Sequence, residues 1–230
     1  MNCGLVNTVH VIDLLDTGLK TYTAMDELQR ELHAKIATGD HPNSALLFEA
    51  ESVYTAGRHT RSRDIIDDSL PIVETDRAGS ITWHGPGQLV CYPLVKLAAP
   101  VDVIKYIRAV EGAVLDTLQN SFDLDVRRIE GRAGVWIDNR KISAIGLKIS
   151  QDATLHGISL NVNTDPASAF SGIIPCGITD ATVTSMAEEG IDTTLGAVAA
   201  PLVAALEHRL EPLLAPTTSK GDVHVYHPAG

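Results

Sequence analysis

Residues 133–149 read AGVWIDNRKISAIGLKI and carry the clearest structural pattern in the chain. An apolar run at 133–137 is followed by a polar turn at 138–140 and a second strand-like run at 141–149. Two such runs joined by a short polar turn predict a β-hairpin. Just beyond it, residues 158–163 alternate between apolar and polar side chains, which predicts a strand with one buried and one exposed face.

The remaining strands and helices arrive in clusters. Further strand-like runs lie at 45–49 and 88–94, and three segments repeat apolar residues with helical spacing. These segments contain Met25, Leu28, Leu32 and Ile36, with Gly39 as a stop; Ile104, Ile107, Val114, Leu115 and Leu118; and Leu195, Val198, Leu202, Leu206 and Leu210. Pro201 is expected to kink or split the third helix. Because strands do not alternate regularly with helices, the sequence predicts an α+β fold with a mixed or antiparallel sheet flanked by helices.

The composition is that of one globular domain. The chain has 230 residues, 44% of them hydrophobic, and 18 Lys and Arg against 29 Asp and Glu give a net charge of −11. No repeat or long linker divides it, so we expect a single domain over 1–230 with a tail-like piece at about 216–230. The negative charge argues against nucleic acid as a partner. No apolar run reaches the roughly 20 residues of a membrane helix, so we expect no membrane association.

Cysteines and short motifs add three expectations. Cys3, Cys91 and Cys176 form no C-x-x-C pair, which favours a reducing compartment over a disulfide framework. No basic, apolar leader opens the chain, and we therefore expect a cytoplasmic protein. The sequence contains no G-x-G-x-x-G, no P-loop and no H-E-x-x-H, so we expect no metal and no cofactor.

The stretch most suggestive of a site is RAGSITWHGPGQLV at residues 77–90. Its glycines, Gly79, Gly85 and Gly87, permit backbone conformations and close approaches that side chains forbid. One interpretation is a tight turn between two strands, with His84 satisfied inside it. The other is a backbone-walled pocket for a small substrate, with Arg77 and His84 as its polar groups.

Two further residues are candidates for chemistry. Lys141 begins the second strand of the hairpin, where a lysine is ordinarily a solvated edge residue. Shielded from water, it could instead shuttle a proton at neutral pH. Cys176 lies in a Pro–Cys–Gly turn, and a helix capped by Thr179 or Asp180 would favour its thiolate through the helix dipole. A buried, inert thiol is the alternative.

Several motifs together resemble those of the lipoyl(octanoyl) transferase family. They are Tyr54-Thr55-Ala56-Gly57-Arg58, the 77–90 stretch running on to Tyr92-Pro93, Gly134-Val135-Trp136-Ile137, Lys141-Ile142 with Ala144-Ile145-Gly146, His156-Gly157 with Leu160-Asn161-Val162-Asn163, and Pro175-Cys176-Gly177. They follow the family's order over about residues 50–186, more than half of the chain. One departure is Ala78, where the family usually has glycine, and the added methyl group could narrow the pocket or require a negative φ.

The resemblance implies the fold of the biotin and lipoate protein ligases and the transfer of an octanoyl or lipoyl group. The implied donor is octanoyl-acyl carrier protein, and the implied acceptors are lysines in lipoyl domains of 2-oxoacid dehydrogenase complexes and in the glycine cleavage H protein. Cys176 would be the nucleophile that carries the acyl group as a thioester, and Lys141 would be its acid/base partner. The implied substrate-binding residues are Arg77, Ala78, Gly79, Ser80, Ile81, Thr82, Trp83, His84, Ala144, Ile145, Gly146, Gly157, Ile158 and Ser159.

Three other functions stay open on the sequence alone. An ATP-dependent lipoate or biotin ligase on the same fold would activate a free acid and would need no nucleophilic cysteine. A cysteine hydrolase would pair Cys176 with His84 or His156 and use water as the acceptor. A non-catalytic acyl-carrying module would bind without turnover.

Local basic clusters matter because the chain as a whole is acidic. Its net charge of −11 would repel an acidic carrier protein at long range, so docking requires a basic face near the pocket. The candidates are Arg58, Arg61 and Arg63 in one cluster and Arg127, Arg128 and Arg132 in another.

Overall fold

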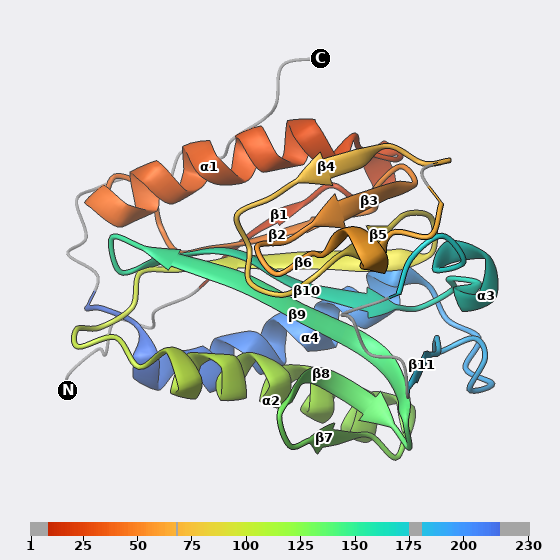
Figure 1. The fold of residues 1–230 in the computed structure, drawn as a ribbon. Coiled ribbons are helices and arrows are strands. Elements are labelled where there is room, and N and C mark those ends of the chain that lie inside the picture. The colour runs from red at the N-terminus through yellow and green to blue at the C-terminus, as the bar shows by residue number, and fades with distance from the viewer. Residues whose placement is uncertain (1–8, 68, 175–180, 217–230) are drawn as a thin grey trace.

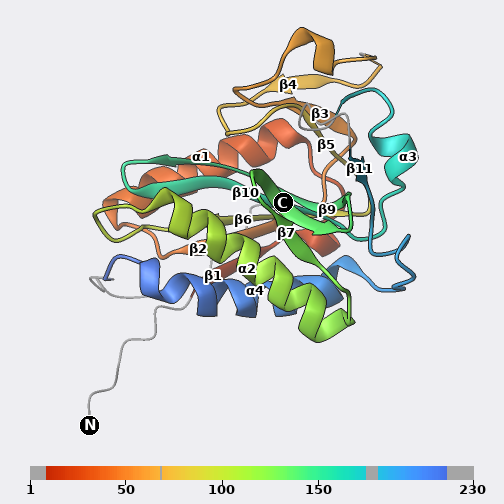
Figure 2. The ribbon, with the colours of Figure 1, turned by 60° about the horizontal axis from the view of Figure 1, so that its bottom comes forward.

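A computed structural model describes residues 9–67, 69–174 and 181–216. One large sheet forms the middle layer, with helix α1 on one face and helices α2 and α4 on the other (Figure 1). Helices α2 and α4 pack side by side, as a second view makes plain (Figure 2). In the described part of the chain, no helix is long and apolar enough to cross a membrane.

The large sheet is mixed, as the sequence predicts. Its order is β1-β2-β6-β10-β9-β8-β7, with β11 pairing to β9. The strands are β1 (His10–Asp13), β2 (Ser44–Phe48), β6 (Gln88–Leu94), β7 (Arg127–Ile129), β8 (Arg132–Ile137), β9 (Arg140–Ser150), β10 (Ala153–Asn161) and β11 (Thr182–Val183). The β1–β2 and β9–β11 pairs are parallel and the others antiparallel, so the predicted α+β class is confirmed.

A second, small sheet carries much of the 77–90 stretch. It has the order β4-β3-β5 and is formed by β3 (Val53–Ala56), β4 (Ile72–Glu74) and β5 (Thr82–His84). It has its own apolar cluster, which joins Tyr54, Ile81 and Trp83 to the region of α3 (Pro166–Ala169). The 77–81 segment connects the two outer strands of this sheet and runs over the large one.

The three long helices follow the predicted apolar stripes. They are α1 (Tyr22–Thr38), α2 (Val103–Phe122) and α4 (Leu195–Leu210), and the short 3₁₀ turns are η1 (Leu15–Thr17), η2 (Ser62–Asp64) and η4 (Glu211–Leu213). Thr21 caps the start of α1 through its side chain, and Gly39 ends the helix with a φ of 82°. A residue in that left-handed conformation closes a helix readily when it is glycine.

The structure corrects two sequence predictions about these elements. Of the two effects expected of Pro201, a split of α4 does not occur, because the helix is continuous from Leu195 to Leu210. Burial of Val198, Leu202 and Leu206 on one face outweighs the roughly 3 kcal/mol cost of an interior proline. Strand β10 is buried on both faces instead of one, because it lies in the centre of a sheet covered on both sides.

Candidate functional site

A cavity of about 410 Å³ lies where the 77–84 segment faces strands β9 and β10, and we call it the 77–84 cavity. It gathers most of the residues that the sequence singles out: Arg77, Ala78, Gly79, Ser80, Thr82, His84, Lys141, Ala144, Ile145, Gly146, Gly157, Ile158 and Ser159. It is also lined by residues outside that prediction, namely His59, Arg61, Arg63, Asp64, Tyr92, Gly131, Arg132 and Ala133. Its volume is within the usual range of about 300–1,000 Å³ for small-molecule sites.

Ile81 and Trp83 do not line this cavity. They lie in the separate apolar cluster under the small sheet, where the Trp83 ring packs 5.8 Å from that of Phe170. Since side chains alternate between faces along a strand, Thr82 and His84 face the cavity while Ile81 and Trp83 face away.

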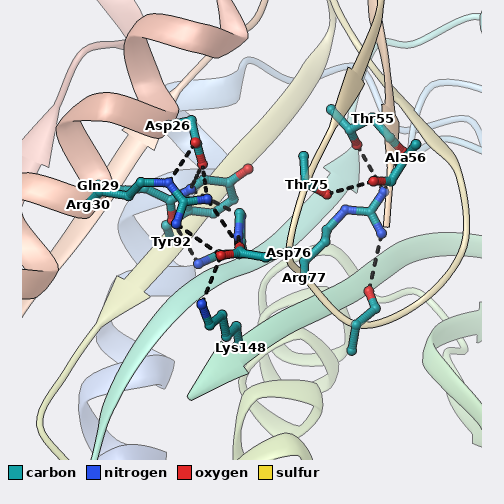
Figure 3. Close-up of polar contacts among 12 residues, drawn as sticks. Asp26, Gln29, Arg30, Thr55, Ala56, Thr75, Asp76, Arg77, Tyr92 and Lys148 are labelled. Atoms are coloured by element: carbon teal, nitrogen blue, oxygen red, sulfur yellow. Dashed lines mark hydrogen bonds and ion pairs between the residues drawn. The ribbon is translucent and has the colours of Figure 1, made fainter. Parts of the chain in front are cut away.

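Arg77 holds the segment in shape. Its guanidinium donates to the Ser80 carbonyl at 2.8 Å and to the Thr55 carbonyl at 2.6 Å, and it is buried (Figure 3). The next residue, Ala78, donates its backbone N–H to the Leu147 carbonyl of β9 at 3.0 Å, without a positive φ. The methyl group of Ala78 is therefore accommodated. A side chain at Gly146 would be crowded, because its Cβ would lie 3.0 Å from the Ala78 carbonyl oxygen and the 77–84 segment would have to shift by a few tenths of an ångström.

Asp76, which the sequence analysis did not single out, anchors the start of the segment. Its carboxylate accepts from Arg30 of α1 at 3.0 Å, from Lys148 of β9 at 2.8 Å and from His156 of β10 at 2.9 Å (Figure 3). Burial alone would raise the pKa of Asp76, but hydrogen bonds from Arg30, Lys148 and His156 hold it well below its usual range. One carboxylate thus ties three elements to the segment that walls the cavity.

His156 is held as a neutral imidazole. Its backbone N–H donates to Gln29 Oε1 at 2.8 Å, and Gln29 Nε2 lies 3.0 Å from its Nδ1. Gln29 Nε2 also donates to Asp26 at 2.7 Å, which fixes the orientation of the amide. Nδ1 must therefore accept, and Nε2–H donates to Asp76. Burial lowers the pKa of His156, in agreement with this assignment.

The His156 backbone adopts a φ of 59° inside β10, an unusual conformation for a residue with a side chain. It immediately precedes Gly157, whose Cβ position would lie 2.7 Å from the Cys91 carbonyl. Such strain persists only where surrounding contacts enforce it, and here Gln29 and Asp76 do so.

His84 is also neutral and enclosed. Its Nδ1 lies 2.7 Å from Gln88 Oε1, and its ring stacks on Tyr22 with centroids 5.6 Å apart. Burial, together with the positive charge of Arg77, lowers the pKa of His84 to about 3. Of the two interpretations, a histidine whose hydrogen bonds are made inside the protein fits better than a polar group free to bind substrate, although His84 still borders the cavity.

Lys141 is buried, with 7% of its surface exposed, so the expectation of a solvated edge residue is wrong. A β-bulge explains its position: Val135 pairs with Ser143 but Trp136 pairs with Lys141, which leaves Ile142 as an extra residue in β9. With strict alternation Lys141 would face the same way as Leu147, into the apolar core. The extra residue turns it to the cavity side.

The bulge is fixed by contacts from α2. Gly134 has a φ of 114°, and its N–H donates to the buried Glu111 at 3.1 Å. A Cβ at Gly134 would lie 2.4 Å from the Ser143 carbonyl oxygen. Glu111 also accepts from Arg108 at 2.7 Å and from Arg128 at 3.0 Å, which stabilises its buried charge.

A second cavity of about 360 Å³, which we call the α3 cavity, shares the lining residue Lys141 with the first. Its lining comprises Trp136, Lys141, Pro166, Ala167, Phe170, Ser171, Ala181, Thr182, Val183 and Glu188. Cys176 lies outside the described residues. The nearest described residues in the chain are placed at the two cavities: Ile174 donates its N–H to the Asp64 carbonyl at 2.8 Å, and Ala181 lines the α3 cavity.

No cluster of three or more His, Cys, Asp or Glu side chains suited to a metal occurs among the residues that the structure describes.

A family model described as the lipoyl protein ligase A/B catalytic domain matches residues 21–207. The chain belongs to this family. The resemblance seen in the sequence is thereby confirmed at family level.

The relatives agree on the class of enzyme. An octanoyltransferase of Nocardia farcinica is 47% identical over 196 residues, which span 82% of this chain and 77% of the relative. An octanoyltransferase of Salinispora arenicola is 44% identical over 191 residues, 80% of this chain and 89% of that relative. The prediction that the chain is an acyltransferase is confirmed at this level.

A solved lipoate-protein ligase A bound with ATP has the same fold, with a TM-score of 0.71, 13% sequence identity, and coverage of 89% of this chain and 86% of that one. At this identity the likeness shows the fold alone. The expected ligase-type architecture is thereby confirmed.

Proposed function

We propose that the chain transfers an octanoyl group from acyl carrier protein to a lysine of lipoyl domains, through a thioester on Cys176. The observation that carries this proposal is the position of Lys141, which is buried and lines both cavities. The bulge turns Lys141 away from the core, and burial shields it from water. Such a lysine is better placed to transfer a proton to a reacting group than a solvated lysine on the surface. The octanoyltransferase relatives support the same substrate class.

In the first step the Cys176 thiolate attacks the thioester carbonyl of the donor. The new C–S bond forms as the bond to the carrier sulfur breaks, and Lys141 gives its proton to that leaving sulfur. This exchange of one thioester for another needs no external energy source. The methyl group of Ala144 and the side-chain-free backbone of Gly146 and Gly157 leave room on the cavity wall for an octanoyl chain.

In the second step the amine of an acceptor lysine attacks the Cys176 thioester. The C–N bond of an amide forms, the C–S bond breaks, and the thiolate is regenerated for the next cycle. The acceptors we propose are the lipoyl domains of 2-oxoacid dehydrogenase complexes and the glycine cleavage H protein. No cofactor enters this scheme.

The contacts of the two histidines speak against a Cys–His hydrolase. His156 has both ring nitrogens engaged, by Gln29 and Asp76, and is fully buried. His84, with a pKa of about 3, is too weak a base to activate a thiol near neutral pH. An ATP-dependent ligase on this fold would require ATP for every turnover, which the experiment below includes as an arm.

Intact mass after incubation with octanoyl-acyl carrier protein tests the proposal. The protein should gain one octanoyl group without ATP, lose it to hydroxylamine, and lose it to an added lipoyl domain. Cys176→Ala should abolish loading, whereas Cys91→Ala at a buried thiol should load normally. Loading of Cys176→Ala, or loading only with ATP, would overturn the mechanism.

A further inference from the structure

The α3 cavity has no counterpart among the residues that the sequence implies for substrate binding, apart from Lys141. We propose that it admits the side chain of the acceptor lysine, while the 77–84 cavity holds the octanoyl group and its donor. This inference rests on the function proposed above. It assigns the two half-reactions to two entrances that share one proton carrier, Lys141.

The two entrances differ in net charge. Arg61 and Arg63 are exposed at the 77–84 cavity, Arg132 borders it as well, and the one carboxylate among its described lining residues, Asp64, is buried. Among the described residues that line the α3 cavity, Lys141 is the only cation, and Glu188 is an exposed carboxylate. A carrier-protein arm is joined through a phosphodiester and is anionic, whereas a lysine side chain arrives as an ammonium. Electrostatic complementarity therefore assigns the donor to the first entrance and the acceptor to the second.

The walls of the α3 cavity suit the four methylene groups of a lysine. Trp136 and Phe170 supply aromatic faces, and Pro166 and Val183 supply aliphatic ones. A lysine side chain buries its methylenes along such surfaces while its charged end seeks polar groups. The Lys141 Nζ lies 4.7 Å from the centre of the Trp136 ring. An acceptor lysine that passes along this ring therefore reaches the amine of Lys141, to which it must give a proton.

The second half-reaction needs a proton acceptor at that point. After loading, Lys141 is neutral, because it has given its proton to the departing carrier sulfur. The entering ammonium gives one proton to Lys141 and becomes the nucleophilic amine. As the C–N bond forms and the Cys176 C–S bond breaks, the nitrogen releases its second proton to water. The thiolate and the protonated Lys141 are thereby restored.

Two exposed alanines at opposite entrances provide a matched pair of variants. Ala167→Trp places an indole at the α3 cavity, and Ala133→Trp places one at the 77–84 cavity. Each variant is loaded with a small octanoyl thioester in single turnover, and the isolated acyl-enzyme is then mixed with a lipoyl domain. Mass spectrometry follows both steps separately.

We expect Ala167→Trp to load within about twofold of the wild-type rate and to transfer at least about tenfold more slowly. Ala133→Trp should slow loading. Glu188→Lys reverses an exposed charge that also accepts a hydrogen bond from the Thr184 hydroxyl at 3.1 Å, so its Tm is measured first. The variant should raise the KM for the lipoyl domain, while the matched reversal Glu27→Lys on α1 should not.

Equal slowing of loading and transfer in Ala167→Trp would overturn the inference, because the α3 cavity would then serve the donor as well. Unchanged transfer in both Ala167→Trp and Glu188→Lys would also overturn it. Failure of the wild-type protein to load at all would instead overturn the proposed function, so the two failures are distinguishable.

Discussion

Lys141 lies opposite Trp136 in the β8–β9 ladder, and its Nζ is 4.7 Å from the centre of the indole ring. Both residues belong to the lining of the α3 cavity, and Lys141 also reaches the 77–84 cavity. An ammonium above an aromatic face is attracted by the ring, most strongly where water is excluded. The ladder and the ring together fix where the amine of Lys141 sits.

The first prediction concerns Lys141 itself. Lys141→Arg keeps a positive charge but cannot release a proton near neutral pH, so acyl loading should slow by about 10²–10⁴-fold. Stopped-flow detection of the released carrier thiol measures this rate. The matched variant Lys148→Arg, on the same strand, should load at a near-normal rate because its role is an ion pair with Asp76. A near-normal rate in Lys141→Arg would mean that charge alone matters at this position.

The second prediction concerns the bulge that turns Lys141 to the cavity. Gly134→Ala should lower the free energy of unfolding by at least about 2 kcal/mol, because it combines a φ of 114° with a Cβ 2.4 Å from the Ser143 oxygen. Gly131→Ala, with a φ of 74° and open space around the added methyl, should cost only about 1 kcal/mol.

For a domain of this size, 1 kcal/mol corresponds to roughly 2–4 °C in Tm, so the two alanine variants should differ measurably in a melting experiment. Gly134→Ala should also lose loading activity at temperatures where it is still folded, because the bulge positions Lys141. Equal Tm values for the two variants would show that contact with Ser143 does not constrain the bulge.

The third prediction concerns Asp76. Asp76→Asn removes the charge that Arg30, Lys148 and His156 share, so it should destabilise the protein by about 1–3 kcal/mol. It should also raise the KM for the octanoyl donor, since Asp76 anchors the segment that walls the cavity. Asp116→Asn removes the exposed pair with Arg209 and should cost about 1 kcal/mol or less, without a KM effect.

Local periodicity predicts the elements that bury a stripe of their own residues. The apolar residues of α1 repeat with helical spacing and stop at Gly39, and the hairpin turn expected at 138–140 is found at 138–139, with Arg140 already in β9. The bulge is different, because Ile142 and Ser143 look like ordinary members of an alternating strand. Only their pairing with Val135 and Trp136 reveals the extra residue, and that pairing is a property of the sheet.

Asp76 was missed for a related reason. Its partners Arg30, Lys148 and His156 lie 46, 72 and 80 residues away in sequence, and no spacing rule connects them. The same limit applies to β10, whose Ser159 and Asn161 predict an exposed face but are buried. Asn161 is satisfied there by Gln88 at 2.9 Å and the Thr184 carbonyl at 2.9 Å. The residues implied by the motif match, by contrast, mostly line one cavity, and their roles in substrate binding stay a prediction.

The fourth prediction is an acid-labile fold. Burial lowers the pKa of His84 to about 3, below the unfolded value of about 6.5, so the unfolded chain binds the extra proton between these pH values. Stability should therefore fall as pH drops through this window, by about 1.4 kcal/mol per pH unit for one proton. The lowered pKa of His156 acts in the same direction. Asp76 adds a loss only below about pH 4, where its unfolded form becomes protonated.

Urea unfolding at several pH values measures this slope. His84→Gln removes one titrating group and should flatten the fall in stability between pH 6.5 and about 4. His208→Gln, an exposed position on α4, is the matched control and should leave the slope unchanged. Identical slopes in wild type and His84→Gln would show that His84 does not stay neutral inside the folded protein.

The last prediction concerns the basic residues beside the 77–84 cavity. Arg61 and Arg63 are exposed there, whereas in the second cluster Arg128 is bound to Glu111 and Arg132 alone borders the cavity. Charges at a rim act mainly on association rate and its salt dependence. The double variant Arg61→Glu with Arg63→Glu should therefore lower kcat/KM for octanoyl-acyl carrier protein and flatten its decline with added salt.

A small octanoyl thioester separates docking from chemistry in this double variant. It does not carry the acidic protein surface, so its rate should fall far less than the rate with the carrier protein. Lys105→Glu, an exposed change of the same sign on α2, should affect neither donor strongly, because α2 covers the opposite face of the sheet. If both donors slow equally in the double variant, Arg61 and Arg63 support the shape of the cavity, and carrier docking must use another surface.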